Sequence, residues 1–325
     1  MPAVTMAKAL NTALGDALEA DDRVVVLGED VGRLGGVFRI TDGLQSRFGE
    51  QRVLDTPLAE SAIIGVSIGL AVRGWRPVAE MQFDGFSFPA FDQIASHLAK
   101  YRNRSMGHVP MPVVVRIPYG GGIGAVEHHS ESPEAYYAHT AGLKVVSPSN
   151  PADAYSLLTE AIKLQDPVVF LEPKRRYWIK QELELPARTA PIGTAEVVRP
   201  GGDLTVVAYG PMVKVALDAA AAAADEGMAD LEVIDLRSLV PLDVDTLVAS
   251  ATHTGRMVVV HEAAEFCGFG AEIAARVTEE AFLSLEAPVL RCTGLDVPYP
   301  PAKLEEAHLP GVDRLLDTVR RALDY

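Results

Sequence analysis

The sequence predicts an α/β protein of two doubly wound domains, in which helices cover both faces of mostly parallel sheets. At 325 residues the chain exceeds the usual size of a single hydrophobic core, which favours two domains. Short runs rich in valine and isoleucine alternate with longer helical stretches, a pattern typical of parallel strands joined by helical crossovers. The runs are largely continuous in apolar residues, which indicates strands buried on both faces.

In the first part of the chain, six apolar runs predict strands and three longer stretches predict helices. Asn150 before Pro151 favours a helix start, because asparagine caps helices and proline suits the first turn. The predicted strands are 24–27, 52–55, 77–80, 113–117, 143–146 and 168–171. The predicted helices are 61–72, 88–101 and 151–163.

The stretch 174–203 differs from the rest of the chain. It is rich in charges, proline and glycine, which predicts a connecting segment with one hairpin. After it the alternation resumes, so that a second, smaller doubly wound domain is expected. Its predicted strands are 204–208, 231–235, 257–261 and 289–293, and its predicted helices are 212–226, 269–282 and 314–323.

Composition and charge exclude several functional classes. No apolar run reaches the roughly 18 residues of a membrane span, and the N-terminus lacks the pattern of a signal peptide. Two cysteines provide neither a disulfide framework nor zinc-finger spacing, so a reducing cytoplasm is the simplest location. The net charge of −15 argues against a nucleic-acid partner. It suits a basic protein partner, or solubility alone.

Glu60 is the most informative single residue. It is the only acid between Asp55 and Glu80, and it stands where a predicted buried strand passes into an apolar helix. Burial there would raise its pKa and let it share a proton with a ligand nitrogen. The alternative is an acid at a helix start, favoured by the helix dipole, with Thr56 or Ser61 as the cap.

An aromatic segment, 83–93, follows the strand that ends at Glu80. In α/β sheets this is the end of the strand at which ligands bind. Phe86, beside a glycine, is the candidate for stacking on a flat heterocycle, whereas Phe88 and Phe91 fit core packing.

A glycine-rich loop, 119–132, follows the next strand and contains two adjacent histidines. It matches neither the dinucleotide fingerprint nor the P-loop, so its glycines indicate an unusual backbone path. In an extended chain His128 and His129 point in opposite directions and cannot easily bind one metal ion. One of them facing a cavity is a candidate acid/base group. A flexible loop with surface histidines is the alternative.

Six ordered motifs together resemble the beta subunit of the thiamine-diphosphate-dependent 2-oxoacid dehydrogenases. The motifs are LGEDV at 27–31, DTPLAE at 55–60, EMQF at 80–83, HSESPEA at 129–135, GLKVVSP at 142–148 and DLRSLVPLD at 235–243. Within the family, HSxSPEA and the aromatic segment look more like the branched-chain enzymes, with the pyruvate enzymes as the close alternative. Glu131 stands where the family motif usually has glutamine, which affects this choice of substrate.

The resemblance implies a transketolase-like fold and roles for individual residues. A pyrimidine-binding domain is expected at 1–185, a linker at 186–203 and a transketolase-type C-terminal domain at 204–325. Glu60 would hydrogen-bond the pyrimidine ring nitrogen of the cofactor, and Phe86 would pack on the pyrimidine. His129 would serve the substrate carboxylate and the transfer of the acyl group to lipoamide. Glu29 and Gln82 are the further cofactor-binding residues that the resemblance implies.

The resemblance also implies partners. Thiamine enzymes bind the diphosphate and Mg²⁺ through a Gly-Asp-Gly motif, which this sequence lacks. The alpha subunit of an α2β2 heterotetramer would supply that half of the site. A structural K⁺ site would correspond to the positions of Ala161, Leu164 and Asp166.

The other implied partner is the dihydrolipoyl acyltransferase core, through its binding domain and its lipoyl domain. An acidic edge of the C-terminal domain is the expected docking surface, with Asp296, Glu305, Glu306 and the carboxylate of Tyr325. A solvated acidic edge is the alternative for these charges. A nucleotide-binding or scaffold protein is the non-enzyme alternative for the whole chain.

Overall fold

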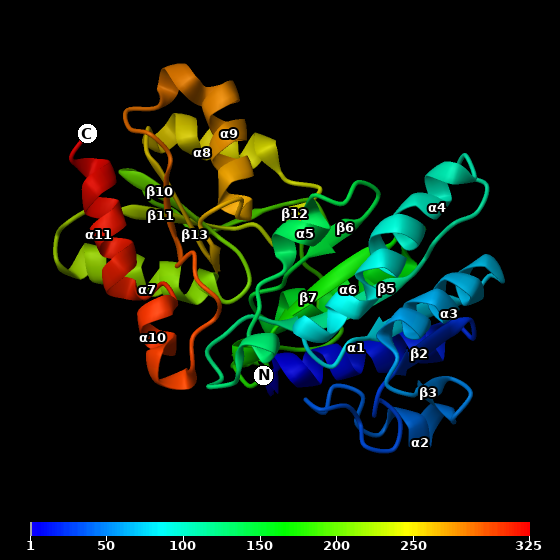
Figure 1. Cartoon of the computed structure of the whole chain (residues 1–325). Coiled ribbons are helices and arrows are strands. Elements are labelled where there is room, and N and C mark those ends of the chain that lie inside the picture. The colour runs from blue at the N-terminus through cyan, green and yellow to red at the C-terminus, as the bar shows by residue number, and fades with distance from the viewer. Residues whose placement is uncertain (1) are drawn as a thin grey trace.

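The computed structural model describes residues 2–325 and confirms the fold class, with two α/β domains side by side (Figure 1). A seven-stranded sheet forms the first domain, in the order β12-β6-β7-β5-β4-β2-β3. A five-stranded sheet forms the second, in the order β14-β13-β10-β11-β9. Parallel pairs predominate in both sheets, as expected of helical crossovers.

In the first domain all six predicted strands and two of the three predicted helices are present, with ends within two residues of the expected ones. The strands are β1 (Ala3–Thr5), β2 (Val24–Gly28), β3 (Val53–Asp55), β4 (Arg76–Glu80), β5 (Val114–Tyr119), β6 (Lys144–Val146), β7 (Val168–Pro173) and β8 (Lys180–Glu182). The helices are α1 (Met6–Ala20), α2 (Leu44–Phe48), α3 (Glu60–Val72), α4 (Ala99–Arg104), α5 (Glu134–Ala138) and α6 (Pro151–Lys163). Short 3₁₀ or π turns are η1 (Gly85–Ala90), η2 (Gln93–Leu98), η3 (Glu127–His129) and η4 (Lys174–Arg176).

Local sequence explains where the long helices begin. The Thr5 hydroxyl accepts a hydrogen bond of 3.1 Å from the backbone N–H of Lys8 and caps α1. The predicted start of α6 is confirmed, because the Asn150 side chain accepts from the N–H of Asp153 at 3.0 Å and Pro151 occupies the first turn. The buried faces of α1 and α6 pack together in one apolar core beside the sheet. A second core, which contains residues of α3 and α4, continues into the second domain.

Two predicted features of the first part of the chain are wrong. The single helix expected over 88–101 is a 3₁₀ turn, a π turn and the short helix α4, and the structure begins earlier, at Gly85. Pro89 lacks a backbone N–H and interrupts regular helical bonding. The hairpin expected within 174–203 is also absent: the two strands of that stretch pair antiparallel with β1 and with β11, not with each other.

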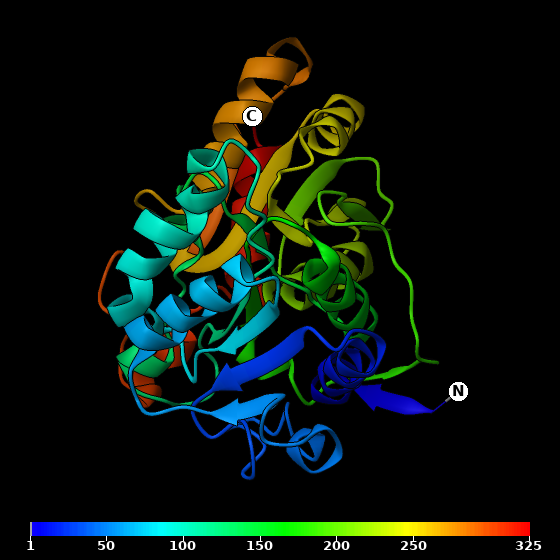
Figure 2. The ribbon, with the colours of Figure 1, turned by 90° about the vertical axis from the view of Figure 1, so that its right-hand side faces the viewer.

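The second domain contains the remaining elements. Its strands are β9 (Glu196–Arg199), β10 (Leu204–Ala208), β11 (Leu231–Asp235), β13 (Met257–Ala264) and β14 (Leu290–Gly294). Its helices are α7 (Met212–Asp225), α8 (Val244–Thr254), α9 (Phe269–Ala281), α10 (Glu305–His308) and α11 (Val312–Leu323), with 3₁₀ turns η5 (Phe282–Ser284) and η6 (Ala302–Leu304). Figure 2 shows the connecting segment running along the outside of the molecule, from β8 near the N-terminus to this domain.

A strand from the second half of the chain joins the two domains. β12 (Ser238–Val240) pairs antiparallel with β6 and forms the edge of the first sheet. Beside it, the buried Arg237 guanidinium reaches the Asp153 carboxylate at 2.6 Å and donates to the carbonyl of Ala190 at 2.7 Å. The domains are therefore tied by a strand pair and a buried ion pair.

None of the helices within residues 2–325 combines the length and the apolar character that crossing a membrane requires.

Candidate functional site

The carboxyl ends of β3, β2 and β4 lie next to one another in the first sheet. Gly28, at the end of β2, pairs with Asp55 on one side and with Glu80 on the other. The chain leaves β2 toward β3 and then returns to the opposite side of β2 as β4. Such a reversal of strand order is a topological switch point, where open α/β sheets bind ligands. Glu29, Glu60 and Gln82 all follow these strands, so the structure brings three of the predicted residues to one edge.

Glu29 and Glu60 form an acidic pair at this edge. Glu60 is the first residue of α3 and is half-buried, so it is less buried than expected. Glu29 is 6 % exposed, and its Oε1 atom has no hydrogen-bond partner among the described residues. Burial raises the pKa of Glu29, and the negative charge of Glu60 raises it further. A buried acceptor without a donor, beside a carboxylate at a helix start, fits a ligand that presents ring nitrogens and amino groups.

Gln82 holds the loop that contains Glu29. Its side-chain amide donates a hydrogen bond of 3.0 Å to the Asp30 carboxylate. Asp30 has a left-handed backbone, with φ of 57°, which turns the chain immediately after Glu29. We therefore assign Gln82 a structural role: it holds the backbone turn that follows Glu29 at the edge of the site.

Phe83 and Phe86 meet both histidines of the glycine-rich loop. The ring centroids of Phe83 and His129 are 4.0 Å apart, and those of Phe86 and His129 are 5.2 Å apart. The expectation of an extended chain here is wrong, because Glu127–His129 forms the 3₁₀ turn η3. The rings of His128 and His129 consequently lie 4.3 Å apart instead of pointing in opposite directions. The aromatic segment and the histidines thus form one cluster.

His129 is the more enclosed of the two histidines. It is half-buried, and its Nδ1 atom is buried without a partner among the described residues, whereas His128 is exposed. Burial lowers the pKa of His129, and the nearby His128 and Lys174 lower it further. A neutral imidazole near pH 7 can both accept and donate a proton, which suits acid/base chemistry.

Lys174 anchors this histidine and was not recognised in the sequence. Its ammonium group donates to the backbone carbonyl of His129 at 2.6 Å and pairs with the Asp84 carboxylate. Burial raises the pKa of Asp84 to about 6, although the charge of Lys174 opposes that rise. The position of Lys174 at the end of a buried strand was the available signal, since parallel strands end at the ligand-binding edge.

A buried charged group lies under the site. The Arg116 guanidinium donates to the Glu172 carboxylate at 2.7 and 2.9 Å and to the Glu80 carboxylate at 2.5 Å. The Tyr177 hydroxyl donates to Glu172 at 2.6 Å. Arg116 and Glu172 are fully buried, and Glu80 is nearly so. This group joins β4, β5 and β7.

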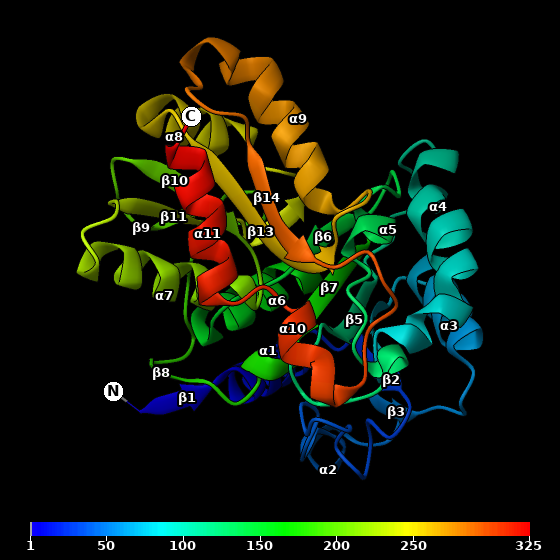
Figure 3. The same cartoon turned by 60° about the vertical axis from the view of Figure 1, so that its left-hand side comes forward.

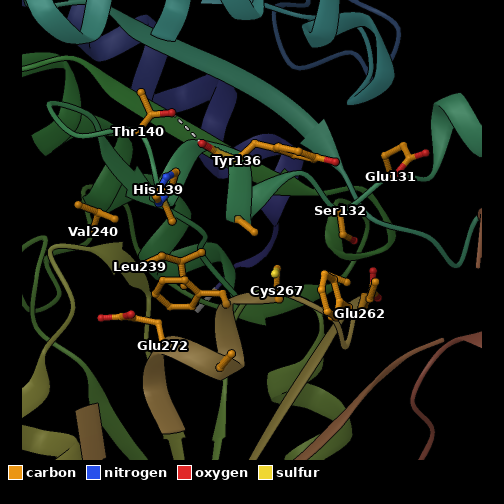
Figure 4. A pocket seen from close by; sticks show the side chains of 18 of the residues that line it. Glu131, Ser132, Tyr136, His139, Thr140, Leu239, Val240, Glu262, Cys267 and Glu272 are labelled. Carbon is orange, nitrogen blue, oxygen red and sulfur yellow. Dashed lines mark hydrogen bonds between the residues drawn. The ribbon is translucent and has the colours of Figure 1, made fainter. Parts of the chain in front are cut away.

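A groove of about 1660 Å³ lies elsewhere, between the two domains (Figure 4). Its walls include Glu131, Ser132 and Tyr136 from the first domain and Glu262 and Cys267 from the second. Glu60, Phe86 and His129 are not among the residues that line it. This groove therefore does not identify the predicted site, which is defined by its chemistry: an acidic pair with an unpaired oxygen and an aromatic cluster with an unpaired imidazole nitrogen.

The expected potassium position does not fit a potassium ion, because a cationic side chain already lies there. The Arg76 guanidinium already contacts the carbonyl oxygens of Ile162, Lys163 and Leu164 at 3.0, 3.3 and 3.2 Å. Asp166 pairs with Arg102. Within residues 2–325, no group of three or more His, Cys, Asp and Glu side chains is placed to hold a metal ion. No catalytic step is therefore assigned to potassium.

Comparison with known proteins decides the family. The transketolase pyrimidine-binding domain family matches residues 2–179, and the transketolase C-terminal domain family matches residues 193–315. The 3-methyl-2-oxobutanoate dehydrogenase subunit beta of Mycobacterium tuberculosis is 60% identical over 320 residues, which cover 98% of this chain and 92% of the relative. The chain belongs to the family of 2-oxoacid dehydrogenase beta subunits. This family depends on thiamine diphosphate.

Similar beta subunits are named for pyruvate as well as for branched-chain 2-oxo acids. The pyruvate dehydrogenase E1 component subunit beta of Leifsonia xyli subsp. xyli is 58% identical, with coverage of 98% of this chain and 95% of the relative. The 2-oxoisovalerate dehydrogenase subunit beta of Pseudomonas aeruginosa is 48% identical, with coverage of 99% and 95%. Among solved structures, a split-gene transketolase described as an inactive beta4 tetramer has a TM-score of 0.82 and 25% identity, with 99% of each chain covered. The predicted transketolase-like fold is confirmed for this beta subunit.

Proposed function

We propose that this chain is the beta subunit of a branched-chain 2-oxoacid dehydrogenase. With an alpha subunit it performs thiamine-diphosphate-dependent oxidative decarboxylation of a 2-oxo acid. The substrate loses CO₂, and its acyl group passes to one sulfur of a lipoyl disulfide while the other sulfur becomes a thiol. The observation that carries this proposal is the acidic pair Glu29 and Glu60, with an unpaired buried oxygen, at the switch point of a pyrimidine-binding domain.

At the pyrimidine half of the site, each residue of this chain has a separate role in cofactor binding or proton transfer. When bound, thiamine diphosphate supplies the carbon nucleophile and the electron sink. Glu60 holds a proton at the pyrimidine ring nitrogen, and Glu29 supports that proton from its buried position. Phe86 would pack on the pyrimidine face. His129, held by Lys174, moves protons for the substrate and for acyl transfer.

The other half of the site comes from an alpha subunit, which would also supply most Mg²⁺ ligands. The sequence contains no Gly-Asp-Gly motif for the diphosphate. The helix that begins at Glu60 supports a shared site, because it exposes apolar side chains that its own domain does not cover. Val66 and Val72 of this helix are 55% and 43% exposed, and Leu58, just before the helix, is 74% exposed. An apolar helix face next to the site is typical of a subunit contact, and we propose an α2β2 heterotetramer.

The acyltransferase core remains a proposed partner, through its lipoyl and binding domains, but the expected docking edge needs correction. Glu305 is 9% exposed and bonds internally, so it does not belong to a surface patch. Asp296, Glu306 and Tyr325 are exposed and stay in the proposal. Cys267 and Cys292 are free thiols, which agrees with a cytoplasmic location.

Pyruvate dehydrogenase is the second candidate, favoured by the 58% identical relative and by the departure at Glu131. One or two methylene groups in a pocket change discrimination by about 1–3 kcal/mol, so the substrate must be measured.

Reconstitution tests the proposed function. The chain is mixed with the alpha chain of its own organism, thiamine diphosphate, Mg²⁺ and lipoamide, and kcat/KM is compared for 3-methyl-2-oxobutanoate and pyruvate. We expect no turnover by either chain alone, and a preference of about tenfold or more for the branched acid in the mixture. A preference for pyruvate would select the second candidate. Appreciable decarboxylation by the purified beta chain alone would contradict the shared site.

A further inference from the structure

The loop between β5 and η3, residues 120–126, is bound by carboxylates of the second domain. We call it the glycine loop. The backbone N–H of Gly121 donates to Glu262 at 3.1 Å. The N–H groups of Gly122 and Gly124 donate to the two oxygens of the Glu305 carboxylate at 2.8 and 3.1 Å. These partners are between 141 and 183 residues away in the sequence.

The conformation of the glycine loop requires glycine. Gly120, Gly122 and Gly124 have φ of 83°, 84° and 69°, a region that other residues rarely adopt. A Cβ atom on Gly121 would lie 1.9 Å from the Tyr299 hydroxyl. Successive backbone N–H groups in such a turn form a cradle for an anion. Here a carboxylate of the same chain occupies the cradle, which explains a motif that fits no nucleotide-binding fingerprint.

The segment that carries this carboxylate reaches from the second domain to the first. Figure 3 shows η6 and α10 below the second sheet, alongside the first domain. Glu305 begins α10, and the Tyr299 hydroxyl donates to its Oε1 atom at 2.6 Å. Glu305 has no cationic partner among its described contacts, so neutral donors from the glycine loop and Tyr299 stabilise its buried charge.

The glycine loop leads directly to the site histidine. Only Ala125 and Val126 separate its last glycine from η3, which ends at His129. Lys174 fixes the other side of this turn through the backbone carbonyl of His129. The backbone of His128 packs against Gly85, where a Cβ atom would lie 2.5 Å from the His128 carbonyl oxygen. The path of the loop therefore determines where the imidazole of His129 stands.

We propose that Glu305 is a positioning residue, assisted by Tyr299, through which the second domain sets the glycine loop and with it His129. The consequence for acyl transfer rests on the proposed function. The contact between Glu305 and the glycine loop does not rest on the proposed function, because it lies within this chain. By this assignment the second domain positions a residue of the active site, a role that is separate from any docking surface.

The test compares Glu305→Gln with Glu279→Gln in the assembled heterotetramer. Both changes remove one carboxylate from a helix of the second domain, but Glu279 is exposed on α9, away from the proposed docking surface, and Glu305 is buried. An amide keeps one acceptor and turns an N–H group toward the loop, so one of the two loop contacts is lost. Hydrogen exchange of peptides covering 120–131 should become about tenfold faster in Glu305→Gln and stay unchanged in Glu279→Gln.

Activity provides the second readout. In Glu305→Gln, kcat for acylation of a free lipoyl domain should fall about tenfold, while decarboxylation with an artificial electron acceptor changes less than about twofold. If Glu305→Gln does not assemble, Tyr299→Phe carries the same test, because it removes only the hydroxyl, which donates to Glu305 and accepts from the N–H of Gly122 at 3.3 Å. Equal exchange and equal acylation in the Glu305 and Glu279 variants would overturn the proposal. An inactive wild-type heterotetramer would instead refute the proposed function, and the exchange readout would still decide the loop contact.

Discussion

Glu60→Gln should slow exchange of the cofactor C2 proton by about 10²–10⁴-fold in the heterotetramer, the usual range for loss of a positioned acid/base group. A neutral amide cannot stabilise a proton at the pyrimidine nitrogen as a carboxylate does. Binding of the cofactor should change little, because in the proposed function Phe86 still contacts the pyrimidine and the alpha subunit holds the diphosphate. The exchange is measured by NMR after acid quenching of the enzyme in D₂O.

The matched control for Glu60 is Glu50→Gln. Glu50 is an exposed acid of the same domain, outside the switch point, so its exchange rate should equal that of the wild type. Normal C2 exchange in Glu60→Gln would remove this residue from the mechanism. If Glu60→Gln instead fails to form the heterotetramer, Glu60 acts in the contact between subunits and not in exchange of the C2 proton.

Arg116→Met should cost about 3–5 kcal/mol of unfolding free energy, because it leaves two buried carboxylates without their cation. The guanidinium joins Glu80 and Glu172 in a fully buried position between three strands. Urea unfolding of the purified chain measures the loss. Arg47→Met is the control: its pair with Glu19 is more than half exposed on both sides, and such pairs contribute about 1 kcal/mol or less.

The pH dependence of the Arg116 variant gives an independent check. Burial already raises the pKa of Glu80, and Arg116 opposes that rise. Without the cation the folded-state pKa of Glu80 should rise further, so the folded state keeps a proton that the unfolded state releases. Stability should therefore fall as pH rises above the unfolded value of about 4.3. The loss relative to wild type should be smaller at pH 5 than at pH 8, and equal losses at both pH values would contradict the assigned cause.

Features that depend on local sequence were predictable. The start of α6 follows from Asn150 and Pro151, and β10 and β11 have the bounds that their apolar runs indicate. The strand alternation also places Glu60 and Phe86 at strand ends, where parallel sheets bind ligands. The expected burial of Glu60 was not met, because the structure puts the more enclosed acid at Glu29.

Features that depend on distant partners were not predictable. Nothing near Gly122 in the sequence reveals that Glu305 accepts its N–H, and the same contact removes Glu305 from the expected docking edge. The His128 and His129 side chains were misplaced because periodicity arguments assume a regular backbone, whereas η3 is a short turn imposed by the loop before it. Likewise a hairpin was expected within 174–203, since a local pattern cannot show that the strands of this stretch, β8 and β9, pair with β1 and β11.

Calorimetric titration with thiamine diphosphate in the presence of Mg²⁺ tests the central claim most directly, that this chain holds only one half of a cofactor site. The titration is performed on the beta chain, on its alpha chain and on the mixture at equal subunit concentration. Tight binding by the mixture, at one cofactor per alpha–beta pair, with affinity at least about 100-fold weaker for either chain alone, is the predicted result. Binding by the isolated beta chain as tight as that of the mixture would contradict it.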